Sequence, residues 1–187
     1  MPLKNYCEIE DIENYLLTEI DVAFESQVER WIEAMERHID KETGRNFKAD
    51  EESSVRKFDG DGEQDLFIDD CIEVEKIEVD GAEKEHWLYP SDELPYTKVI
   101  LKDSVFTKGN QNIEITAKWG YSEDVPADIE FACTVLVAGI INRSLSHEGE
   151  VQSKTVGPYS VTFKTEKQWS DFEQIEGTLE KYKKYSF

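Results

Sequence analysis

The chain has 187 residues, with 42 acidic against 21 basic side chains and a formal net charge of −21. Binding of nucleic acid by phosphate neutralisation needs clustered Lys and Arg, and the sequence clusters them at Lys181, Lys183 and Lys184 alone. The composition therefore argues against tight binding of DNA or RNA. It fits either a protein kept dispersed by its charge or a surface that lies near DNA without holding it.

Three cysteines, Cys7, Cys71 and Cys133, are odd in number and far apart in the sequence. They predict neither a disulfide framework nor a zinc site. The N-terminus has no basic region followed by an apolar run, so we expect no signal peptide and a reduced, intracellular setting. The length predicts one domain, or one domain with an insertion.

Apolar side chains at helical spacing predict two helices within residues 1–50. The first runs over residues 8–17, and the second follows an N-cap at Asp21 and ends at Thr43-Gly44. The apolar face of the second helix is predicted to comprise Phe24, Val28, Trp31, Ile32, Met35 and Ile39. A solvated acidic face is predicted opposite, formed by Glu25, Glu29, Glu33, Glu36 and Asp40.

Residues 55–122 change to a period of two, which is typical of strands. The predicted strands are 56–59, 66–68, 72–79, 99–101 and 113–119, and His86 is predicted to lie in a loop. Turn signals occur at residues 59–62, 80–81 and 108–110. This region predicts an antiparallel meander or a small barrel-like sheet inserted between helices.

Residues 125–147 predict a core helix that opens with Pro126 in its first turn and is apolar nearly all round. Residues 151–163 predict a hairpin around Gly157-Pro158. Residues 168–184 predict a C-terminal helix with a capping box at Ser170–Glu173. We therefore expect an α+β fold, with a small helical bundle around a buried central helix and an inserted antiparallel β-rich region.

One stretch resembles a calcium loop, because Asp59, Asp61 and Asp65 alternate with other residues and Asp70 stands twelfth. Gln64 occupies the sixth position, where such loops place glycine, so a turn that connects strands is the favoured interpretation. A metal-dependent hydrolase built on these carboxylates is the weakest functional hypothesis. The histidines show no spaced Ser, Cys or Asp partner of a catalytic triad. We expect no enzyme activity and no cofactor.

Several motifs follow one another in an informative order. They are Tyr6–Leu16, Thr43-Gly44-Arg45, Phe58–Gly62 with Leu66–Asp70, Trp119-Gly120-Tyr121 up to Val125-Pro126 with Asn142-Arg143, and Val156–Val161. In this order they resemble the head–tail connector, or adaptor, proteins of long-tailed double-stranded DNA bacteriophages. The β-rich middle is longer than in the compact, mostly helical members of that family.

The resemblance implies a structural virion protein without catalysis. Such proteins form a ring, commonly twelve-fold, between the portal and the tail or stopper, where the ring extends the DNA channel. The implied location is the virion, and the host cytoplasm during assembly. The alternative is an acidic protein that mimics DNA and inhibits a DNA-binding enzyme, which explains the charge but not the order of the motifs.

Local charge predicts where partners bind. Residues 164–187 carry five acidic and five basic side chains, whereas the rest of the chain is strongly acidic. Contacts to neighbouring subunits or to the portal are therefore predicted at Val156, Tyr159, Val161 and Phe163, taken as exposed, and at Lys181, Lys183 and Lys184. If the docking surface lies elsewhere, the β-rich insertion is the next candidate.

Overall fold

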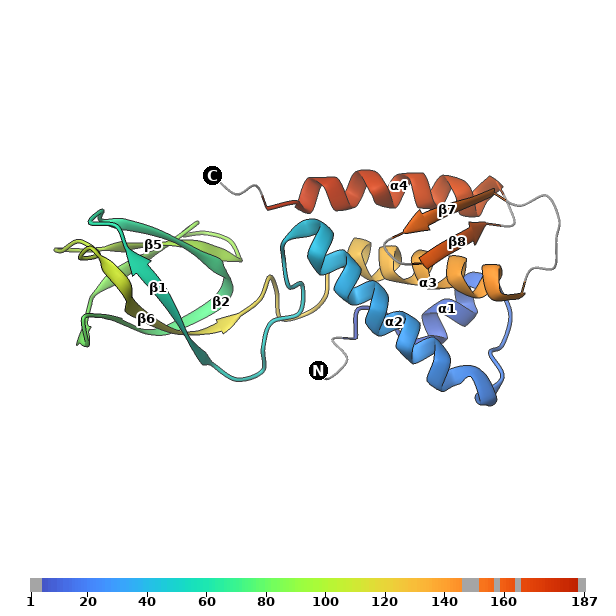
Figure 1. Ribbon diagram of the computed structural model, residues 1–187, viewed down its shortest axis with the longest axis horizontal. Helices are drawn as coiled ribbons and strands as arrows, with labels where there is room; N and C mark the ends of the chain where they lie inside the picture. Colours follow the sequence, from blue (N-terminus) through green and yellow to red (C-terminus); the bar gives the residue numbers. More distant parts are fainter. Residues whose placement is uncertain (1–4, 146–151, 157–158, 164–165, 185–187) are drawn as a thin grey trace. The chain divides into compact units, whose positions relative to one another are not determined.

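The computed structural model shows an α+β chain of two compact units (Figure 1). It describes residues 5–145, 152–156, 159–163 and 166–184. Residues 1–45 and 125–187 form the first unit, which we call the helical unit. Residues 46–124 form the second, the β unit.

The helical unit begins with the two predicted helices, α1 (Ile9–Leu16) and α2 (Val22–Thr43). A capping box between Glu8 and Asp11 starts α1. Asp21 starts α2, since its Oδ1 accepts a hydrogen bond of 2.9 Å from the backbone N–H of Ala23. Gly44 ends α2 with a φ of 68°, a left-handed conformation that favours glycine. The predicted caps of α2 are confirmed.

Helix α3 (Ala127–Leu145) is the predicted apolar helix, and its described side chains are buried from Ala132 to Asn142. It contacts α1, α2, α4 (Glu166–Tyr182) and β8 (Tyr159–Phe163). Figure 1 shows β8 and its hairpin partner β7 (Gln152–Val156) beside α3 and α4. These two strands pair antiparallel, as predicted. Among the described residues, no helix combines the length and the apolar character needed to cross a membrane.

Helix α4 starts earlier than predicted. It begins at Glu166, so Ser170 lies inside the helix and does not cap it. Phe172 and Ile175 on α4 are both 2% exposed, which places this helix in the core of the helical unit. Its C-terminal end is tied to the end of α2, because Arg45 Nε donates to the carbonyl of Tyr182 at 2.6 Å. The backbone N–H of Lys184 likewise donates to the carbonyl of Thr43 at 2.7 Å.

Two predictions for the faces of α2 are wrong. Phe24, predicted to be buried, is 59% exposed. Glu36, predicted to be solvated, is only 2% exposed because the segment before α1 covers it. Tyr6 in that segment donates its backbone N–H to Glu36 Oε1 at 2.9 Å and its hydroxyl to Asp40 Oδ1 at 2.6 Å. We call residues 6–7 the N-terminal strap.

The β unit holds a six-stranded sheet in the order β1-β6-β2-β5-β4, with β3 paired to β2. All of these pairings are antiparallel, as predicted. The strands are β1 (Ser54–Gly60), β2 (Asp65–Val79), β3 (Ala82–Glu83), β4 (His86–Tyr89), β5 (Tyr96–Leu101) and β6 (Gly109–Trp119).

The predicted strands differ from the structure at several points. The two strands expected at 66–68 and 72–79 are one strand, β2, whose register shifts interrupt the alternation of apolar side chains. His86 lies in β4 and not in a loop. Gly109 and Asn110 belong to β6, whereas Asp80-Gly81 forms the predicted turn, with φ values of 52° and 76°.

The buried side of the sheet is apolar. Its fully or nearly fully buried side chains are Ile68, Cys71, Ile77, Val79, Val99, Leu101, Phe106, Ile113, Ile115, Ala117 and Trp119. Gly120 follows Trp119 with a φ of 142°, and a Cβ atom there would lie 2.4 Å from the Cα of Ala49. Both the backbone conformation and the close approach therefore require glycine at this corner.

Burial of α3 yields a prediction for stability. Leu136 is 2% exposed, so Leu136→Asp would bury a charge without a partner at a cost of several kcal/mol and should prevent folding. The matched control is Phe131→Asp on the same helix, where the side chain is 37% exposed and the protein should stay folded. Circular dichroism melting compares the two. A Leu136→Asp protein that melts like the wild type would contradict the buried position of α3.

Candidate interaction surfaces

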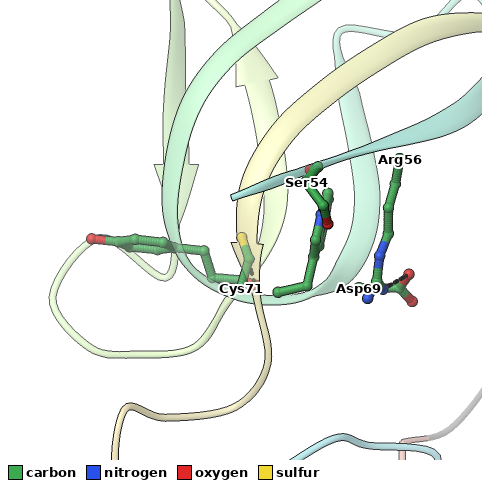
Figure 2. Close-up of polar contacts among 6 residues, drawn as sticks. Ser54, Arg56, Asp69 and Cys71 are labelled. Atoms are coloured by element: carbon green, nitrogen blue, oxygen red, sulfur yellow. Dashed lines mark hydrogen bonds and ion pairs between the residues drawn. The ribbon is translucent and has the colours of Figure 1, made fainter. Parts of the chain in front are cut away.

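The Trp119 corner is built from polar contacts that join four strands, and Figure 2 shows part of this network. Trp119 is fully buried, and its indole Nε1 donates to the carbonyl of Ser54 at 2.9 Å. The guanidinium of Arg56 lies 4.5 Å from the centre of the Trp119 ring and donates to Asp69 Oδ2 at 2.6 Å. Cys71 lies beside them and contacts the carbonyl of Tyr96 at 3.8 Å. Trp119 is therefore a core residue of the β unit.

The calcium-like stretch does not bring its carboxylates together. Asp59 Oδ1 accepts the backbone N–H of Gln111 at 2.6 Å, and Asp61 Oδ1 accepts the backbone N–H of Glu63 at 2.9 Å. Asp65 pairs with the ammonium of Lys98 at 3.4 Å. In the described part of the chain, no group of three or more His, Cys, Asp or Glu side chains could hold a metal ion. Asp61 acts as a turn-forming acceptor instead, whereas Asp59 links β1 to β6 through Gln111.

The other side of the β sheet presents aromatic side chains. Phe67 on β2 is paired with Lys98 on β5, and Lys98 is paired with Tyr89 on β4, so these three form one row across the sheet. The neighbouring row consists of Asp65, Ile100 and Trp87. Each of these residues is two positions from a member of the first row on the same strand, so both rows lie on the same side of the sheet. Phe67 is 70% exposed, Trp87 55% and Tyr89 54%. We call these six residues the aromatic face.

Lys98 in this face and Lys102 beside it balance the charges of Asp65 and Glu85. The ammonium of Lys98 lies 5.5 Å from the ring centre of Phe67 and 5.0 Å from that of Tyr89. Lys102 lies 5.9 Å from the ring of Trp87 and 3.1 Å from Glu85 Oε2. Cation–π contacts of this kind hold the rings in place at about 0.5–1 kcal/mol each when exposed. The face is thus apolar and locally neutral in a strongly acidic chain, and exposed apolar patches of this kind mark interaction sites.

A groove of about 850 Å³ lies in the helical unit. Its lining side chains come from the α1–α2 connection, the start of α2, the end of α3 and Gln168 of α4. Phe24 and Trp31 contribute apolar surface to this groove, where Phe24 is exposed. Its polar wall includes Asn142, whose Nδ2 donates to Gln168 Oε1 at 3.3 Å.

The residues predicted to contact partners differ in their exposure. Val161 is fully buried, so its predicted exposure is wrong, because β8 packs against α3. The side chains of Val156, Tyr159 and Phe163 lie outside the described part of the structure. Lys181, in the last turn of α4, is exposed.

The two other lysines follow the end of α4. Lys183 pairs with Glu180 at 2.6 Å, and Lys184 is half-buried near Gly44. A basic end of α4 is therefore present at the surface, next to the C-terminal end of α2.

The model of the head completion protein family matches residues 7–185. The chain belongs to this family. The resemblance to head–tail connector proteins inferred from the sequence motifs is thereby confirmed. No curated protein matches the chain.

Two solved structures share the fold along the whole chain. One is a chain from "Neck of empty GTA particle computed with C6 symmetry", with a TM-score of 0.63 and 12% sequence identity. The other is from "Neck of native GTA particle computed with C12 symmetry", with a TM-score of 0.60 and 10% identity. Each comparison covers 100% of this chain and 94% of the other. At such low identity, the likeness shows the fold.

The separated carboxylates of residues 59–65 predict the response to calcium. Millimolar calcium should change the melting temperature by less than about 1 °C, since a ligand stabilises the native state only by occupying it. Differential scanning fluorimetry with magnesium as the control ion measures this. A saturable rise of several degrees that Asp61→Ala abolishes would favour the calcium-loop hypothesis instead.

Proposed function

We propose that the chain is a structural component of the neck of a tailed, DNA-containing particle, where copies form a ring between the portal and the tail or stopper. The family match over residues 7–185 carries this proposal. The fold shared with chains from particle necks computed with six-fold and twelve-fold symmetry supports the ring. The proposed role is assembly in the virion, with no catalytic step.

A ring of identical chains needs two different surfaces on each copy, because its interfaces are head-to-tail and must close. In an acidic chain, two copies meet with least repulsion where the local charge is balanced. The aromatic face meets this condition, since Lys98 pairs with Asp65 and Lys102 pairs with Glu85. We propose that the aromatic face binds a neighbouring copy of the chain.

The basic end of α4 suits a different occupant. Lys181 is exposed, and the lysines at this end form a locally basic surface on a protein whose net charge is −21. Opposite charges steer and orient partners. We propose that this end binds an acidic surface of the portal protein, and that the hairpin residues Val156, Tyr159 and Phe163 contact a partner as well.

The excess of acidic side chains suits the wall of a channel through which DNA slides. The β unit alone holds 21 acidic and nine basic side chains. A basic wall would release counterions and hold DNA tightly, whereas an acidic wall repels phosphates. We propose that DNA passes the ring without tight binding. A DNA-mimic inhibitor would explain the charge equally well, but it explains neither the family match nor the shared fold.

Substitutions on the aromatic face test the contact between copies. Phe67→Ser with Trp87→Ser should weaken ring formation about tenfold or more, because truncating an aromatic anchor in an interface costs on the order of 2 kcal/mol. Val55→Ser is the matched control, as Val55 is a 53% exposed apolar residue on β1 of the same sheet. Native mass spectrometry with purified portal protein counts the copies. Rings that form equally well in both variants would refute this contact.

Charge reversal at the end of α4 tests the portal contact. Lys181→Glu should weaken binding to the portal protein several-fold, and more at low salt, because the contact is electrostatic. Lys108→Glu is the control, since Lys108 is also exposed but lies in the β unit. Titration at two ionic strengths separates the variants. Equal loss in both would indicate a general effect of net charge and contradict the proposed site.

A further inference from the structure

Two cysteine thiols meet in the core of the helical unit. Cys7 Sγ lies 3.1 Å from Cys133 Sγ, although the residues are 126 positions apart in the chain. Cys7 is 4% exposed and Cys133 is fully buried. The third cysteine, Cys71, is equally buried but lies in the β unit. The structure thus brings together one pair of thiols and keeps the remaining thiol in the other unit.

The contacts around Cys7 hold the pair in this position. The adjacent residue, Tyr6, is fully buried and is fixed to α2 through Glu36 and Asp40. Cys133 is fixed within helix α3. Cys7 lies in the non-helical strap before α1, where the backbone can adjust more readily than in a helix. Closing the sulfur–sulfur distance to the ~2.05 Å of a disulfide bond requires movement of only about 1 Å.

We propose that Cys7 and Cys133 form an intramolecular disulfide when the particle leaves the reducing interior of the cell. The oxidant is a low-molecular-mass disulfide or another two-electron thiol oxidant. With oxidised glutathione, one protein thiolate attacks a glutathione sulfur and releases one glutathione thiolate. The second protein thiolate then attacks the protein sulfur of the mixed disulfide and releases the other. Two thiols are oxidised, one glutathione disulfide is reduced to two thiols, and two protons pass from the protein thiols to the glutathione thiolates.

The burial of the pair sets the conditions for this reaction. The hydrogen bond with Cys7, followed by burial, raises the pKa of Cys133 well above its usual range, so little thiolate is present in the closed state. Oxidation therefore requires a brief opening of the N-terminal strap and is slow. Once formed, the bond links the strap to α3 and encloses α1, α2 and the whole β unit in one covalent loop. A long loop restricts the unfolded chain strongly, which favours the folded state.

The experiment uses the full chain, reduced, freed of reductant and then incubated with oxidised glutathione. Alkylation in denaturant followed by intact-mass measurement counts the free thiols, and peptide mapping locates the bridge. We expect the count to fall from three to one, with Cys7 linked to Cys133. Cys71→Ala should leave the bridge unchanged, and Cys133→Ala should abolish it. The oxidised protein should melt at a temperature on the order of 10 °C higher than the reduced protein.

Three results would overturn the proposal. The first is three free thiols after incubation at temperatures up to just below the melting transition. The second is a bridge that includes Cys71, or glutathione adducts on Cys7 and Cys133 without a link between them. The third is an oxidised protein that melts no higher than the reduced one, because such a bond would be incompatible with the native packing of the strap against α3.

Discussion

The structure of the helical unit depends on one constraint, which is that α3 has too few polar side chains to face water. From Ala132 to Asn142 each of its side chains is buried, so other elements must cover it on several sides. Helices α1, α2 and α4 and strand β8 do so, although they come from opposite ends of the sequence. Apolar side chains fill this core, and most acidic side chains lie at the surface. There their charge affects solubility and association with partners more than it determines the fold.

Local signals in the sequence are sufficient for the ends of α2 but not for the burial of its side chains. Asp21 and Gly44 mark the ends of α2 because a cap depends on residues within one turn. The burial of Glu36 could not be predicted from α2 alone, since Tyr6, 30 positions earlier, covers it. The burial of Val161 could not be predicted for the same reason, because helix α3, which packs against β8, lies elsewhere in the sequence.

One of the two candidate surfaces can be predicted from the sequence, and the other cannot. A basic end at Lys181 is visible in the sequence as a change in local charge. The aromatic face is not, because Phe67, Trp87 and Tyr89 come together through the pairing of β2, β5 and β4. One signal for it was available: Phe67 alternates with Leu66 and Ile68, so a strand here places Phe67 on the side opposite the core. The missing information was the position of β4.

The proposed role in joining head and tail is tested most directly by making particles without this chain. We expect heads that contain DNA and separate tails, with few joined particles seen by electron microscopy. Supplying the purified wild-type protein should restore joining, and a cryo-electron microscopy reconstruction should show a closed ring of this chain between portal and tail. Normal numbers of tailed, infectious particles in the absence of the chain would contradict the account.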